Sequence, residues 1–149
     1  MGFPKNVLIS AGIATVATTF AAALLGRRET GSYAAPLNAT SHIAFGDEAA
    51  DQDDFTIRYT ATGVVINALA MVSWAAIQEY VAGKWARQGP PVRALAAGTA
   101  TSAVAYVTDY HVVPERLTPG FEKRLSNEAL AIVYGVLAVG LALGIRSGK

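Results

Sequence analysis

Four long runs without a charged residue alternate with polar segments along this chain. They cover residues 6–26, 59–78, 94–108 and 129–145, and a charged side chain flanks each run on both sides. A helix rises 1.5 Å per residue, so about 20 residues cross a hydrocarbon core of about 30 Å. Lipid offers the backbone no hydrogen-bond partner, which leaves helices as the expected conformation. The pattern predicts an all-α, polytopic membrane protein built as a bundle of four transmembrane helices.

The four predicted spans belong to one domain covering residues 1–149. We place them at about residues 6–26, 56–82, 92–110 and 127–146. The first two uncharged runs reach the required length, whereas the fourth is slightly short and its ends can extend polar side chains towards water. The third is the shortest. It can cross only if Arg93 and Asp109 lie at the membrane boundaries, or if neighbouring helices shelter it.

An even number of spans places both termini on one side, and the connections after the first and third spans on the other. We call these two connections together the cap. Every acidic residue except Glu79 lies on the cap side, whereas lysine and arginine are evenly divided and give no clear orientation. We expect both termini in the cytoplasm. Short interfacial helices are predicted in the cap, one from Pro36 to near Gly46 and another starting at Thr118 and Pro119.

Composition supports a membrane protein and argues against nucleic-acid binding and cysteine-based chemistry. Hydrophobic residues make up 52% of the chain and charged residues only 15%, against about 25% charged in soluble domains. The net charge of +1 is scattered, without the basic stripe that nucleic-acid binding requires. Cysteine is absent, which excludes disulfides, thiolate metal sites and cysteine nucleophiles.

Small and polar residues indicate which helix faces meet. In lipid, helices associate through close packing of small side chains and shared hydrogen bonds. The third span is almost entirely small, so we expect it at the centre of the bundle. On the second span, Gly63 and Asn67 belong to a small and polar stripe that should face protein. On the fourth, Gly140 and Gly144 form a GxxxG pair that packs either within the bundle or between protomers.

The two histidines suggest a metal-binding site as an alternative hypothesis. His42 and His111 fall on the cap side together, and with Asp109 and Asp47 they could bind zinc, manganese or iron. No paired metal-ligand spacing supports this, and neither histidine lies deep enough in a span for a bis-histidine haem. We therefore predict no cofactor and keep the metal site as an alternative. Asp109 and His111 fit better as the end of the third helix, before a loop at Pro114, than as a catalytic pair.

Transport would require ionisable groups inside the spans, and none lies at mid-span. Asn67 is the deepest strongly polar residue, and a helix–helix hydrogen bond accounts for it. Glu79 lies near the end of the second span, where we expect water to reach it. A homo-oligomeric channel remains a further alternative.

Two segments carry a resemblance. "LNATSHIAFGDEAA", "DYHVVPERLTPGFEKRLS" and the spacing of the four spans resemble a family of small, uncharacterised four-span proteins of the bacterial inner membrane, for which no activity is assigned. The resemblance implies a fold and a location, and no catalytic residues. We therefore expect a non-catalytic accessory or structural subunit or assembly factor, whose partners are the lipid bilayer and other membrane-protein subunits or further copies of itself.

Overall fold

The computed structural model describes residues 2–148, and every regular element among them is helical, as predicted. In chain order they are α1 (Gly2–Thr30), α2 (Ala35–Thr40), α3 (His42–Phe45), η1 (Asp47–Asp51), η2 (Ile57–Ala61), α4 (Thr62–Gln88), α5 (Pro91–Val107), η3 (Thr108–Val112), η4 (Glu115–Leu117), η5 (Phe121–Lys123) and α6 (Asn127–Ser147). The two π-helical turns, η2 and η3, begin α4 and follow α5 without a break.

Three helices are long and apolar enough to cross a membrane. They are α1, the continuous helix Ile57–Gln88 formed by η2 and α4, and α6. The remaining long helix, α5, has 17 residues and ends at Val107, before the predicted boundary near residue 110. The backbone continues from there as the π-helical turn η3, in which Asp109 and Tyr110 lie.

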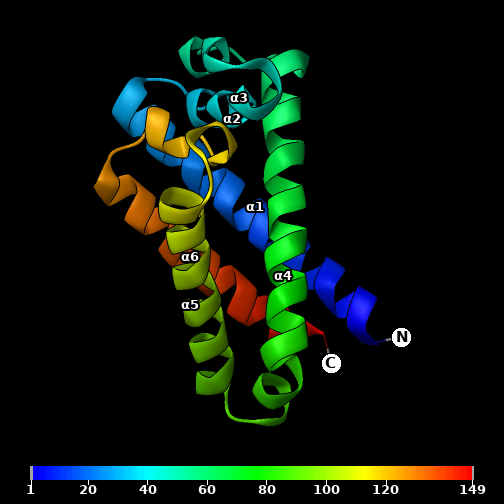
Figure 1. The fold of residues 1–149 in the computed structure, drawn as a ribbon. Coiled ribbons are helices and arrows are strands. Elements are labelled where there is room, and N and C mark those ends of the chain that lie inside the picture. The colour runs from blue at the N-terminus through cyan, green and yellow to red at the C-terminus, as the bar shows by residue number, and fades with distance from the viewer. Residues whose placement is uncertain (1, 149) are drawn as a thin grey trace.

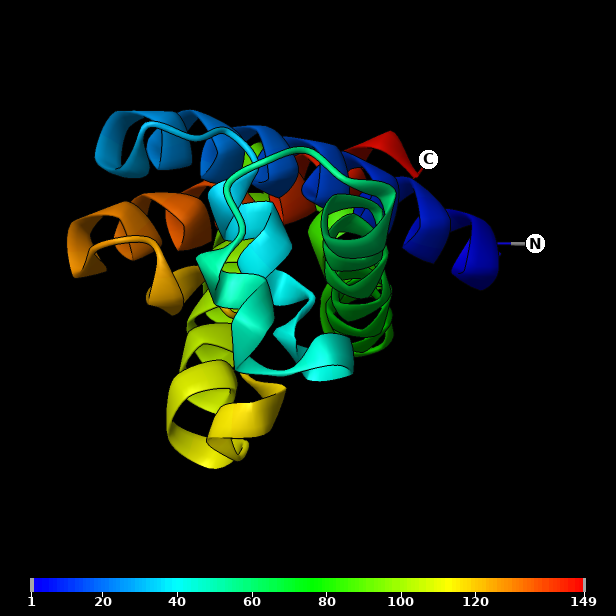
Figure 2. The ribbon, with the colours of Figure 1, turned by 90° about the horizontal axis from the view of Figure 1, so that it is seen from above.

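The four long helices form two antiparallel pairs that cross each other. Helices α4 and α5 make a hairpin whose short connection lies at the opposite end of the molecule from the cap (Figure 1). Seen from above, α4 is nearly end-on while α1 and α6 lie side by side across it (Figure 2). Both labelled termini lie towards the end of the hairpin connection, away from the cap (Figure 1).

Small residues set the close approach of the long helices. Gly144 of α6 lies against Ser10 of α1, where an added Cβ would come within 2.5 Å of the Ser10 Cα. One turn earlier, a Cβ on Gly140 would come within 3.3 Å of the Ala14 Cα. The GxxxG pair of α6 therefore packs inside this chain, against α1.

Buried hydrogen bonds join the same helices. Asn67 Nδ2 of α4 donates to Thr18 Oγ1 of α1 over 3.1 Å. Ser102 Oγ of α5 donates to the carbonyl oxygen of Tyr134 on α6 over 2.6 Å. Gln78 Nε2 of α4 donates to the carbonyl oxygen of Leu141, also on α6, over 3.2 Å. Because such groups lack water in a membrane, these bonds fix the register of the helices.

The cap consists of residues 31–56 and 108–126. Its first connection folds inwards, and residues 34–42, which include all of α2, are buried. The start of α4 touches this segment so closely that a Cβ on Gly63 would overlap the carbonyl oxygen of Leu37. The predicted helix start at Thr118 and Pro119 is wrong, because the chain turns at Gly120, with φ of 90°, before the helical turn η5 begins.

Candidate functional site

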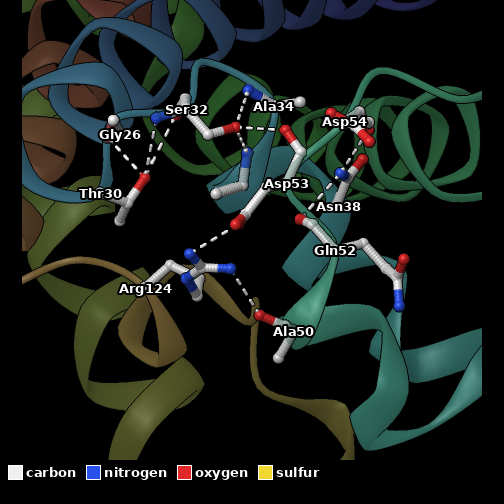
Figure 3. A network of polar contacts seen from close by, with 12 residues as sticks. Gly26, Thr30, Ser32, Ala34, Asn38, Ala50, Gln52, Asp53, Asp54 and Arg124 are labelled. Atoms are coloured by element: carbon white, nitrogen blue, oxygen red, sulfur yellow. Dashed lines mark hydrogen bonds and ion pairs between the residues drawn. The ribbon is translucent and has the colours of Figure 1, made fainter.

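The two connections of the cap are held together by Arg124. Its Nη2 lies 2.7 Å from Asp53 Oδ1, and its Nη1 donates to the carbonyl oxygen of Ala50 over 2.8 Å. Arg124 comes from the second connection, and Asp53 and Ala50 come from the first (Figure 3). A planar guanidinium that contacts both a carboxylate and a carbonyl fixes its partners more tightly than a point charge does.

Short polar side chains organise the first connection around α2. Ser32 Oγ accepts from the backbone amides of Ala34 and Ala35 and donates to the carbonyl oxygen of Asp53 (Figure 3). Asn38, which is fully buried, donates through Nδ2 to the carbonyl oxygens of Gln52 and Asp54. Asn38 thereby satisfies backbone groups that would otherwise lack partners in a buried loop.

His42 joins the two connections at a second point. Its side chain is buried, and Nε2 lies 2.7 Å from the carbonyl oxygen of Thr118. A carbonyl oxygen only accepts, so Nε2 carries the proton in this contact. The hydroxyl of Thr118 in turn donates to the carbonyl oxygen of Glu115 or to Glu122 Oε1.

Beneath these contacts, Asp109 connects the cap to α6. The hydroxyl of Tyr134 donates to Asp109 Oδ2 over 2.6 Å. The rings of Tyr106 and Tyr110 pack against the same tyrosine, with centroids 5.2 Å and 5.9 Å from its own. The hydroxyl of Tyr110 and Oε2 of Glu122 are buried and have no hydrogen-bond partner among residues 2–148. The junction therefore contains buried polar atoms to which the described residues offer no hydrogen-bond partner.

A cavity of about 80 Å³ lies next to this junction. Its walls come from α1, α2, α3, α4 and α6, together with Asp109 and other residues of the second connection of the cap. Most of the lining is apolar, and the polar side chains among it include Thr18, Thr40, Asn67, Asp109 and Tyr134. This lining resembles that of a small-molecule site, but the cavity is well below the roughly 300–1,000 Å³ of such pockets.

A second, more polar hollow of about 300 Å³ lies on the outer surface of the cap. Its lining includes His42, Asp47, Glu115 and Lys123. The Lys123 ammonium lies 3.8 Å from Asp47 and 3.9 Å from Glu115, and both carboxylates are almost fully exposed. Exposed ion pairs at these distances contribute little to the stability of the fold. Their charged groups are therefore accessible to a binding partner.

The four candidate metal ligands do not assemble into a metal centre. No three histidine or acidic side chains within residues 2–148 lie close enough together to hold a metal ion. His42 is committed to the Thr118 carbonyl, and Asp109 bonds to Tyr134. His111 is exposed beside Tyr106, with ring centroids 6.1 Å apart, and Asp47 faces Lys123.

Sequence reasoning missed a buried ionic cluster at the opposite end of the molecule. Glu79 was expected in reach of water, yet it is only 8% exposed. Both guanidinium Nη atoms of Arg87 donate to its carboxylate, one of them over 2.7 Å, and Asn6 Nδ2 donates to the same carboxylate over 3.0 Å. Gly83 lies between the two charged residues, where a Cβ would come within 2.5 Å of Glu79 Oε2. The spacing Glu79–Gly83–Arg87, two steps of four residues, is the signal that marks this pair.

Comparison with known proteins does not place this chain in a family. No protein-family model, no curated protein and no solved structure matches the chain.

Proposed function

We propose that this chain is a four-span protein of the bacterial inner membrane that acts as a non-catalytic accessory subunit, with both termini in the cytoplasm. In this arrangement α5 is the third span, and the cap lies at the opposite membrane face. The cap binds another membrane protein or a second copy of the chain. This assignment agrees with the resemblance carried by the two cap segments.

The packing of α5 supports its role as a span. It packs against α6 at Gly98, which lies next to the Ala138 backbone, and one turn later at Ser102, whose hydroxyl donates to the Tyr134 carbonyl oxygen. Seventeen residues extend about 26 Å, close to the thickness of a hydrocarbon core of about 30 Å. The turn η3 supplies the remaining length, and α4 and α6 cover two sides of the helix.

The single observation that carries the non-catalytic assignment is the use of the polar groups in the cap. His42, Arg124 and Asp109, the side chains with catalytic capability, each join one segment of the cap to another or to α6. Such contacts build a rigid platform. They commit one polar atom of each of these side chains to holding the fold rather than to a substrate.

The outer surface of the cap supports a partner-binding role. Exposed acids gather on the first connection, among them Asp47, Asp51 and Asp54. They are accompanied by the exposed apolar side chains Phe55 and Ile57. An apolar surface bordered by charge is typical of protein contacts, and its acidic character favours a partner with a basic surface.

The test is extraction of the full-length protein in mild detergent, followed by mass determination of the intact assembly. We expect a defined hetero- or homo-oligomer that dissociates as salt rises from 0.05 to about 0.5 M, since salt screens exposed charges. The triple variant Asp47→Asn, Asp51→Asn, Asp54→Asn should dissociate at lower salt. The matched control, Lys5→Gln with Lys84→Gln, changes exposed charges at the other end and should leave the assembly intact. A homogeneous monomer at every salt concentration contradicts the proposal.

A further inference from the structure

A basic hollow of about 470 Å³ lies at the hairpin end of α4 and α5, away from the cap (Figure 1). Its lining includes the cations Lys84, Arg87 and Arg93 and the carboxylate of Glu79. Arg87 donates to Glu79 through both Nη atoms, so these two charges cancel each other. Within residues 2–148, no acidic side chain forms an ion pair with Lys84 or Arg93. The hollow therefore has a surplus of positive charge.

Arg93 is held in place at the wall of this hollow. Its guanidinium carbon lies 5.2 Å from the centroid of the Trp85 ring, which forms a cation–π contact between α5 and α4. The Arg93 side chain also passes over Gly89, where an added Cβ would come within 2.2 Å of Arg93 Cδ. Neither contact occupies the guanidinium N–H groups, which bind the oxygens of a phosphate well. Arg93 is therefore positioned to receive an anion.

An apolar groove between α4 and α5 adjoins the basic hollow. The groove has a volume of about 250 Å³, and Val81 lines both spaces. Its walls include Trp74, Ile77 and Val81 on α4, and Ala97, Ala100 and Val104 on α5. Val81 and Val104 are exposed by 76% and 55%, so the groove is open along its side. A hydrocarbon chain can enter such a groove laterally from a bilayer.

The same helix faces continue from the groove to the hollow. On α4, positions 74, 78, 81 and 85 follow one another at three- and four-residue spacing, and so do positions 93, 97, 100 and 104 on α5. A helix rises 1.5 Å per residue, so Trp74 and Lys84 are about 15 Å apart along α4, which is half of a hydrocarbon core of about 30 Å. The hollow and the groove together therefore match the depth of one leaflet, on the side of the hairpin connection.

We propose that the hairpin end of α4 and α5 binds an anionic glycerophospholipid from the hairpin-side leaflet, with its phosphate in the basic hollow and one acyl chain in the groove. The phosphate oxygens accept hydrogen bonds from Lys84 Nζ and from the Arg93 guanidinium. A zwitterionic lipid offers the same chain, but its ammonium group would lie among these cations, so it binds more weakly. The proposal rests on α5 lying in the membrane beside α4, as in the four-span arrangement above.

The test uses the fluorescence of Trp74, which lies in the groove wall. Trp85→Phe keeps an aromatic ring beside Arg93 and leaves Trp74 as the remaining tryptophan. Full-length protein with this change is reconstituted in vesicles of phosphatidylcholine and phosphatidylglycerol at about 4:1, where bromine on the acyl chains of phosphatidylglycerol, or of an equal amount of phosphatidylcholine, quenches a nearby tryptophan. We expect phosphatidylglycerol to be preferred by about fivefold or more, the effect of at least one cation beside an anionic head group. Equal quenching by the two brominated lipids overturns the proposal.

Charge variants separate this site from general attraction to an anionic membrane. Lys84→Gln and Arg93→Gln each remove one cation of the hollow and should lower the preference for phosphatidylglycerol about fivefold. The matched control is Lys5→Gln, which removes an exposed cation of α1 outside the hollow and should leave the preference unchanged. Equal effects of the three variants contradict a defined site.

Groove variants test the acyl chain. Ala100 belongs to the groove wall, and Ala103 is an exposed residue of α5 outside the groove. The readout is the ratio of quenching by the two brominated lipids, which simple shielding of Trp74 by a larger side chain does not alter. Ala100→Leu should bring this ratio close to one, and Ala103→Leu should preserve it. The same ratio in both variants contradicts the role of the groove.

Soluble glycerol 3-phosphate carries the same phosphate ester without acyl chains. Added at the same total concentration as phosphatidylglycerol, it should leave the quenching unchanged, and a loss of quenching would overturn the assignment to a lipid. Failure of the four-span arrangement is detected separately, because positions 84 and 115 would then be accessible from the same side of the membrane. Accessibility from opposite sides, together with equal quenching by the two lipids, would refute the lipid site alone.

Discussion

Breaking the buried Glu79–Arg87 pair should be one of the most destabilising single changes in the chain. The Glu79 side chain is 5% exposed and that of Arg87 is 17% exposed. Arg87→Met removes the cation and leaves a buried carboxylate with Asn6 as its remaining described donor. Removing one partner of a buried pair costs about 3–5 kcal/mol, because the other charge stays uncompensated.

The double-mutant cycle isolates the cause of this loss. Glu79→Gln alone should cost less, about 1–2 kcal/mol, because an amide oxygen still accepts from Arg87 and Asn6, and Arg87 lies near the surface. Combined with Glu79→Gln, Arg87→Met no longer leaves a buried charge. The double variant should therefore be more stable than the sum of the two losses predicts, by about 2 kcal/mol.

The assay is unfolding of the detergent-solubilised protein by increasing SDS, followed by the fluorescence of Trp74 and Trp85. The matched control is Arg58→Met, which breaks an exposed pair with Glu48 at 3.4 Å and should cost less than about 1 kcal/mol. The reasoning is refuted if Arg87→Met costs no more than Arg58→Met. It is also refuted if the two changes in the cycle simply add.

Two further predictions concern the contact between cap and helices. Gly63→Ala should destabilise the protein by about 2 kcal/mol or more, because the added Cβ would overlap the Leu37 carbonyl oxygen. Gly135→Ala, whose Cβ would meet nothing within 4 Å, should stabilise the protein by up to about 1 kcal/mol. SDS unfolding compares the two variants, and equal changes in stability would contradict the packing of Gly63 against Leu37. Asp109→Asn keeps an acceptor for the Tyr134 hydroxyl and should therefore cost less stability than Asp109→Leu, which removes that acceptor. SDS unfolding compares the two variants, and equal losses would show that the hydrogen bond does not hold the cap to α6.

The long helices were predictable because their signal is local. A run of uncharged residues flanked by charges marks a helix whatever its neighbours are, and α1, α4 and α6 lie where such runs occur. Asn67 was also interpretable from sequence, since a lone polar residue in an apolar helix needs a partner on another helix. It has that partner in Thr18.

The cap and the contact of Glu79 with Asn6 depend on residues far apart in the sequence, which periodicity does not encode. Nothing local distinguishes the buried Asn38 from an exposed loop asparagine, because its partners are 14 to 22 residues away. Glu79 was misplaced for the same reason. Its position near a helix end indicates access to water, but Asn6 of α1 and Arg87 cover it.

The central claim is that α5 crosses the membrane, which places the two cap connections on one face. The chain has no cysteine, so single cysteines at the exposed positions Asp47, Lys84 and Glu115 can be labelled in intact and permeabilised cells with a membrane-impermeant maleimide. Four spans predict that positions 47 and 115 react from one side and position 84 from the other. Reaction of positions 84 and 115 from the same side would mean that α5 does not cross, and would contradict the account.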